Sequence, residues 1–151
     1  MDRKNFVETI ISLTILTIII LISTSLIMNQ KLLVGPLFIF LGAVSLIPPI
    51  LCKISLNNLK SDMLFGFIDN GALVIFAITG AELFGVFGAI LGGVIGNAIT
   101  DGIAGLFEGL EAQKLGNKEK RSMLSVAIGK LAGSLLGSGI MLTIMWNILG
   151  L

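Results

Sequence analysis

Long apolar runs alternate with short polar segments along this 151-residue chain. Residues 6–28 and 32–54 are two such runs, separated by Asn29-Gln30-Lys31, and another run covers residues 122–149. Each is long enough to supply the roughly 20 apolar residues that a helix needs to cross a bilayer. The pattern therefore predicts a membrane-spanning helix at each of these three places.

The middle of the chain, residues 63–110, is apolar and rich in glycine, and it contains no Lys or Arg. This segment is too long for one span and about right for two. A turn near Gly80-Ala81-Glu82 would divide it. We therefore expect helices at 63–80 and 83–110 that form a hairpin, which the helix at 122–149 closes.

The positions of the basic residues favour this hairpin, because cytoplasmic loops of membrane proteins carry most of the Lys and Arg. With the hairpin, only Lys31 falls on the outer side, and the cytoplasmic side holds Arg3, Lys4, Lys53, Lys60, Lys114, Lys118, Lys120 and Arg121. Without it, the two sides become nearly equal. We therefore predict a single all-α domain over residues 1–151, a polytopic integral membrane protein of about five transmembrane helices. Its N-terminus is expected in the cytoplasm and its location in the cell membrane.

The composition agrees with a lipid environment and narrows the chemistry. Hydrophobic residues make up 55% of the chain and charged residues 13%, against about 45–50% and about 25% in soluble domains. Histidine is absent and Cys52 is the only cysteine, so the usual general base and the usual zinc ligands are missing. No enzyme motif is present, and the few basic residues have no interleaved aromatics. We expect neither catalysis nor nucleic-acid binding.

Glycines at regular spacing mark the last helix. Gly129, Gly133 and Gly137 follow one another at intervals of four residues, with Ser134 and Ser138 beside them. Small residues at this spacing let membrane helices approach closely. Packing within the chain is one interpretation, and a seam of a homodimer or other homo-oligomer is another. The two are compatible.

Acidic side chains inside the apolar hairpin are the strongest functional signal, because each costs about 2.5–3.5 kcal/mol to insert into a membrane. Asp69 and Asp101 are the two that are hardest to explain as surface residues. If the chain turns near Ala81, Asp62 lies level with Thr100 and Asp101, and Asp69 lies about one helical turn from Asn97. On the second helix of the hairpin, one polar stripe about 100° wide holds Asn97, Thr100, Asp101, Glu108 and Glu111. With Asp69 and Asn70, this stripe is expected to line a cleft open to the cytoplasm.

The ligands in this predicted cleft are all oxygen atoms of carboxylate, amide and hydroxyl groups. Such ligands suit Mg²⁺, Mn²⁺ and Fe²⁺, and a desolvated carboxylate can also carry a proton. A divalent cation would be the substrate, with no permanently bound cofactor. Glu108 and Glu111 would attract the ion at the cytoplasmic mouth. In the plainer interpretation these two glutamates lie among lipid headgroups, where a charge costs little.

Several of these residues also follow the pattern of a known family. The first helix of the hairpin carries Asp62, Gly66, Asp69-Asn70, Phe76-Ala77 and Gly80, and the second carries Gly92, Gly93, Gly96, Asp101, Glu108 and Glu111. In this order they resemble the first helical pair of the vacuolar iron transporter family, which moves iron and manganese. Asn70 stands where that family has a glycine, and the family's methionine ligand has no counterpart. The resemblance implies a metal ligand at Asp69 and a dimer with the ion path along its two-fold axis.

Two functions follow as hypotheses. The first is a transporter or pore for a divalent metal cation that uses the intramembrane carboxylates. The alternative is a small membrane scaffold or accessory subunit that does not transport and whose glycines only pack helices.

Overall fold

The computed structural model describes the backbone of residues 3–115 and 122–151, and within it the side chains of residues 6–104, 106 and 122–151. Every regular element in this part of the chain is helical, which confirms the predicted all-α class. The elements are α1 (Arg3–Ile27), α2 (Lys31–Val44), α3 (Ile47–Leu51), the 3-10 turn η1 (Leu56–Asn58), α4 (Lys60–Leu115), α5 (Met123–Leu142) and the π-helical turn η3 (Thr143–Ile148).

In the part of the chain that the structure describes, four helices are long and apolar enough to cross a membrane, covering residues 6–27, 31–51, 60–104 and 123–148. Their outer surfaces carry large apolar side chains, for example Leu26, Leu83 and Val86, which are 77%, 68% and 79% exposed. Soluble proteins rarely expose such a large continuous apolar surface to water, whereas membrane helices expose it to lipid. The chain is an integral membrane protein.

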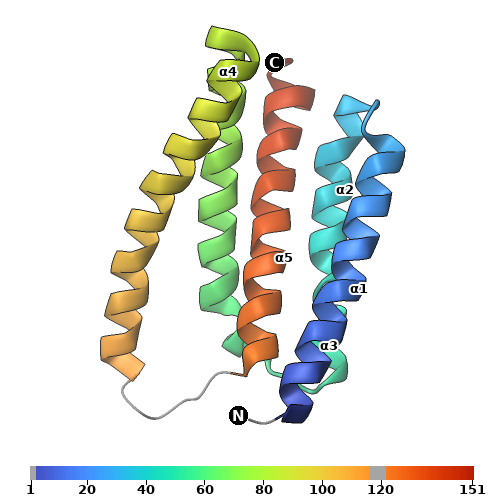
Figure 1. Ribbon diagram of the computed structural model, residues 1–151, viewed down its shortest axis with the longest axis vertical. Helices are drawn as coiled ribbons and strands as arrows, with labels where there is room; N and C mark the ends of the chain where they lie inside the picture. Colours follow the sequence, from blue (N-terminus) through green and yellow to red (C-terminus); the bar gives the residue numbers. More distant parts are fainter. Residues whose placement is uncertain (1–2, 116–121) are drawn as a thin grey trace.

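Helix α5 is the centre of the bundle, with α4 on one side and α1 and α2 on the other (Figure 1). Ile128 and Ala132 on α5 are fully buried. Ile128 belongs to a core cluster with Leu16, Leu59 and Leu124, which joins α1, the residue just before α4, and α5 near the start of α5. The central position of α5 means that the other long helices are placed by their contact with it.

Helix α4 reverses direction at Phe84 (φ −138°, ψ 18°) and Gly85 (φ 61°, ψ −145°). Residues 60–83 form a first arm and residues 86–115 a second arm, which run side by side (Figure 1). The expected turn at Gly80-Ala81-Glu82 is wrong, because those residues continue the helix. Gly85 makes the turn, since its backbone conformation is one that only glycine adopts without strain. The hairpin itself is present, while the count of five spans stays a prediction.

The two arms touch through glycines on both sides of the turn. A Cβ atom added to Gly88 would meet the carbonyl of Gly80, and one added to Gly92 would meet the carbonyl of Phe76. Gly80 and Gly88 are each four residues from position 84, and Phe76 and Gly92 are each eight. The register therefore places Asp69, fifteen residues before position 84, opposite position 99 and next to Thr100.

This register corrects the predicted depths. The sequence placed Asp62 level with Thr100 and Asp69 near Asn97, because the turn was placed too early. A hydrogen bond between Asp69 and Thr100 shows that these two residues share one level.

The other long segments differ from their predicted bounds in understandable ways. The helix expected at 32–54 breaks after α2, where the Ser45 hydroxyl donates to the Leu41 carbonyl at 2.8 Å. Pro48 and Pro49 then lie in the first turn of α3. Backbone N–H groups there have no partner within the helix, so the missing N–H of proline costs no hydrogen bond. The helix expected at 122–149 continues as α5 and then as the π-helical η3. The helix expected at 6–28 agrees with α1 to within a few residues.

Gly85→Ala is expected to destabilise the hairpin by about 1–3 kcal/mol, because its backbone conformation (φ 61°, ψ −145°) lies close to a region that almost only glycine occupies. Gly102→Ala is the matched control, since a Cβ at either position meets nothing within 4 Å and only Gly85 has a positive φ. Thermal unfolding of the purified protein in detergent would show a lower midpoint for Gly85→Ala alone. Equal midpoints for the two variants would contradict the turn at Gly85.

Candidate functional site

Asp69 is a buried carboxylate on the first arm of α4, and it is 9% exposed. The Thr100 hydroxyl on the second arm donates to its Oδ1 atom. The same hydroxyl oxygen lies 3.0 Å from the Gly96 carbonyl and 3.1 Å from the Asn97 carbonyl. Because a hydroxyl has one hydrogen, Thr100 can turn it toward the carboxylate or toward its own helix.

Asn70 connects this carboxylate to α5. Its Nδ2 atom donates to the Ser134 hydroxyl at 2.8 Å and lies 3.3 Å from Asp69 Oδ2. Both oxygens of the carboxylate are therefore held by donors, one from each arm of α4. We refer to Asp69, Asn70, Thr100 and Ser134 as the Asp69 site.

Close helix contacts position these groups. An added Cβ at Gly66 would lie 2.8 Å from the backbone nitrogen of Ser134, and one at Gly133 would lie 2.7 and 2.8 Å from backbone atoms of Met63. The first arm of α4 and α5 thus meet backbone to backbone, as small residues permit. This brings the short Ser134 side chain within reach of Asn70.

The glycines predicted to pack the last helix all face α4 of the same chain. Gly129 lies against Asp62, Gly133 against Met63, and Gly137 against Phe67. These contacts are the packing within the chain that was the first interpretation of the glycine spacing. This face of α5 is filled and offers no free surface for a second copy.

Asn97 and Asp101 form a separate pair on the second arm. Asn97 Nδ2 donates to Asp101 Oδ2 at 2.8 Å, and Asp101 is exposed. Asp101 follows Thr100 by one residue, which is a rotation of about 100° around the helix. Its carboxylate therefore points in a different direction and is not part of the Asp69 site.

The structure thus divides the predicted ligand set. Asp69, Asn70 and Thr100 come together, whereas Asn97 and Asp101 form the second pair. Glu108 and Glu111 have side chains outside the described residues. Ser134 is a member of the site that the sequence did not single out for chemistry. Its only signal was its place next to Gly133, where α5 approaches its neighbour most closely.

The Asp69 site offers a cation one carboxylate, one amide oxygen and two hydroxyl oxygens. Within the described side chains, no group of three or more His, Cys, Asp or Glu residues lies close enough to hold a metal ion. The described part of one copy therefore brings a single carboxylate, rather than a cage of carboxylates, to this site.

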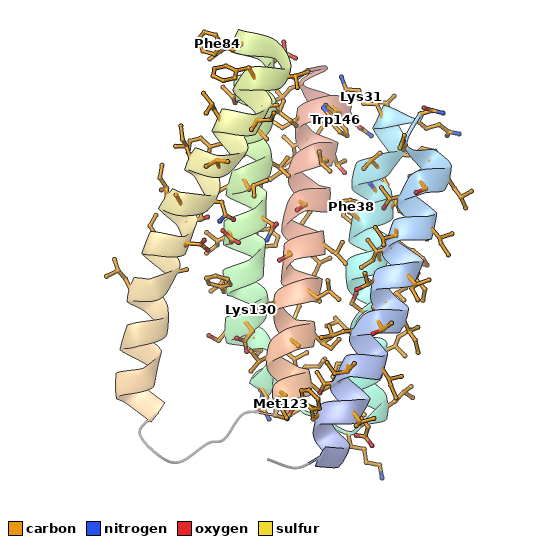
Figure 2. All side chains as sticks on the ribbon, viewed as in Figure 1. Lys31, Phe38, Phe84, Met123, Lys130 and Trp146 are labelled. Atoms are coloured by element: carbon orange, nitrogen blue, oxygen red, sulfur yellow. The ribbon has the colours of Figure 1, made fainter. Side chains whose placement is uncertain are left out.

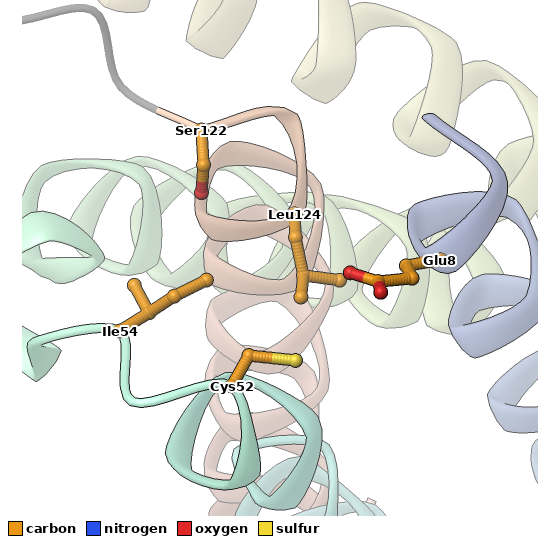
Figure 3. Close-up of a pocket in the computed structure, with 5 residues that line it drawn as sticks. All are labelled: Glu8, Cys52, Ile54, Ser122 and Leu124. Carbon is orange, nitrogen blue, oxygen red and sulfur yellow. The ribbon is translucent and has the colours of Figure 1, made fainter. Parts of the chain in front are cut away.

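A cavity also opens at the end of the bundle where α5 begins (Figure 3). It is lined by side chains from α1, the end of α3, the following connection and α5: Glu8, Cys52, Ile54, Ser122 and Leu124. The Ser122 hydroxyl accepts from the Ser125 backbone nitrogen at 3.1 Å and caps α5. This cavity includes none of the predicted ligands.

Comparisons of the chain with protein-family models, with curated proteins and with solved structures found no match. The resemblance of residues 61–114 to the vacuolar iron transporter family therefore stays a hypothesis that rests on the residues alone. The Asp69 site is the feature from which a function can be inferred.

Proposed function

We propose that this protein is a membrane transporter or pore for a divalent metal cation of the iron, manganese and magnesium class, and not an enzyme. The observation that supports this most is the buried Asp69 carboxylate, surrounded by three oxygen-bearing side chains from both arms of α4 and from α5. Ionisable groups inside membrane segments commonly mark ion pathways, because their burial is costly. The all-oxygen ligand set fits a hard or borderline divalent cation.

The same proposal includes five membrane crossings with a cytoplasmic N-terminus. The reversal of α4 at Phe84 and Gly85 supports it, because each arm is then about one bilayer long. Lys31 Nζ lies 5.6 Å from the centroid of the Trp146 ring, at the end of the bundle that also holds Phe84 (Figure 2). Tryptophan is enriched at both membrane interfaces, so this end fits a membrane boundary, and the loop charges make it the outer one in the proposal.

Depth follows from this topology. Asp69 is 16 residues before Gly85, or about 24 Å along the helix at about 1.5 Å per residue. The hydrocarbon layer is about 30 Å thick. The Asp69 site then lies inside the layer, in its cytoplasmic half.

Ion binding would use the two positions of the Thr100 hydroxyl. When the hydroxyl hydrogen turns to the Gly96 or Asn97 carbonyl, the Thr100 oxygen and Asp69 Oδ1 both become available to a cation. The hydrogen bond to the carboxylate re-forms when the ion leaves. Asn97, Asp101, Glu108 and Glu111 complete the proposed path on the cytoplasmic side, and the working unit is a homodimer or other homo-oligomer.

The second candidate function is a scaffold or accessory subunit that transports nothing. It is favoured by the fact that Asp69 already has protein donors at both oxygens. It is also favoured by the use of the α5 glycines in packing. A carboxylate that only ties three helical segments together would show the same contacts.

Uptake of Fe²⁺, Mn²⁺ and Mg²⁺ into liposomes that hold the purified protein distinguishes the two functions. We expect saturable uptake of at least one of these cations, and none in protein-free liposomes. Glu82→Gln should transport like the wild type, because Glu82 is exposed on the last turn before the reversal of α4. Folded, inserted protein that moves none of the three cations would favour the scaffold.

A further inference from the structure

The second arm of α4 has a face that no other part of the described chain covers. The arm packs on the first arm through Gly88 and Gly92, and it lies at the edge of the bundle with the first arm between it and α5 (Figure 1). Val86 and Ile90 on the free face are 79% and 60% exposed. An added Cβ at Gly93 would meet nothing within 4 Å.

This free face is polar at one point. Ile90, Gly93 and Asp101 all lie within about 40° of Asn97 around the helix axis, at 100° per residue. The Asn97–Asp101 pair therefore stands on the same stripe as Ile90 and Gly93. In the proposed topology, with Gly85 at the outer boundary, Asp101 is 16 residues after the turn and lies about 24 Å from it, inside the hydrocarbon layer. Lipid chains offer neither donor nor acceptor to this pair.

The pair keeps the capacity to bind a second molecule. An amide carries two N–H groups, and a carboxylate has two oxygens with several acceptor positions. Asn97 uses one N–H for Asp101 Oδ2. Whatever covers this face must offer a matching donor and acceptor at the same depth.

We propose that a second copy of this chain covers this face, with the second arms of the two copies packed against each other. Copies of a membrane protein insert in one orientation, because loop charge sets it, and a two-fold axis along the membrane normal then brings identical residues to one depth. Asn97 would meet Asp101 of the partner subunit about one turn away, the spacing it already bridges in its own helix. Gly93 would allow the two helices to approach closely.

A copy of the chain satisfies these requirements by symmetry, whereas another protein would need a matching pair at the same depth. This seam replaces the one considered at the α5 glycines, whose face is filled. It rests on the topology given under the proposed function and places the proposed path residues Asn97 and Asp101 between two copies. It does not require ion transport, because a scaffold can dimerise in the same way.

Cysteine cross-linking tests the seam. Cys52 is the only cysteine, so Cys52→Ser gives a cysteine-free background for Ile90→Cys, Gly93→Cys and the control Ile95→Cys. Ile95 is 51% exposed but lies about 160° around the helix from Asn97. On oxidation in native membranes we expect disulfide-linked dimers for Ile90→Cys and Gly93→Cys, and none for Ile95→Cys.

Three results would overturn the proposal. One is equal cross-linking of Ile95→Cys, which indicates random collision, and another is the absence of dimer from all three variants. The third concerns Gly93→Leu, whose side chain has open space in a single copy. We expect this variant to elute as a folded monomer where the wild type elutes as a dimer. An unchanged dimer would exclude this seam, whatever the ion-uptake assay shows.

Discussion

Gly133→Ala is expected to lower the unfolding temperature sharply, and Gly133→Leu to leave little folded protein. The new Cβ would lie 2.7 and 2.8 Å from the carbonyl carbon and the Cα of Met63, and closer still to its carbonyl oxygen. These are backbone atoms of the first arm of α4, so no side chain can turn aside to relieve the contact. Overpacking of this kind costs about 1–3 kcal/mol and occasionally more.

The control is Gly102→Ala, which adds the same methyl group to a helix where nothing lies within 4 Å. This substitution should stabilise the protein by about 0.5–1 kcal/mol, because glycine in a helix interior is less favourable than alanine. Unfolding in detergent, followed by circular dichroism, compares the two. If Gly133→Ala unfolded like the wild type and changed only the oligomeric state, the packing against Met63 would be refuted. A homo-oligomer seam at the α5 glycines would then be the better interpretation.

The length and charge of the apolar runs were sufficient to predict the helical hairpin. A span needs about 20 apolar residues, and residues 63–110 have room for two. The position of the turn could not be predicted in the same way. Gly80 and Gly85 are both available, and Gly80 is used for contact with Gly88 rather than for the reversal. Only the packing of the two arms decides which glycine takes the positive φ.

A small error in the turn had a large effect on the site. The residue opposite Asp69 is position 93 if the chain turns at 81, and position 99 if it turns at 84. Moving the turn by three residues therefore moves the opposite residue by six, which is more than one and a half helical turns. For this reason the sequence identified Asp69 and Thr100 as ligands without pairing them with each other.

Ser134 was beyond prediction for a different reason. The spacing of Gly129, Gly133 and Gly137 shows which face of α5 is in close contact, but it does not show which helix lies there. The partner is the first arm of α4, and this choice brings Asn70 to Ser134. Hydrogen bonds between helices far apart in the sequence depend on which helices pack together. The residue pattern of one helix does not predict that choice.

Asp69→Asn is expected to abolish cation uptake while the protein stays folded. The amide has the size of the carboxylate, and its single oxygen can accept from Asn70 while its NH2 group donates to the Thr100 oxygen. The Thr100 hydroxyl hydrogen can then turn to the Gly96 or Asn97 carbonyl. The variant removes the single negative charge of the Asp69 site, and a divalent cation is held there chiefly by that charge. Unchanged unfolding and unchanged elution on size exclusion would establish that the loss concerns the site.

Thr100→Val provides a graded companion to this variant. It keeps the charge of Asp69 and the size of residue 100, but it removes the hydroxyl that touches Oδ1. Loss of a group that orients a metal ligand typically costs about 10–100-fold in affinity or activity, so uptake should fall without disappearing. A transporter thus predicts the order wild type, Thr100→Val, Asp69→Asn for uptake. In a scaffold, both substitutions would alter stability or assembly alone. Uptake by Asp69→Asn at the wild-type rate would remove Asp69 from the ion path.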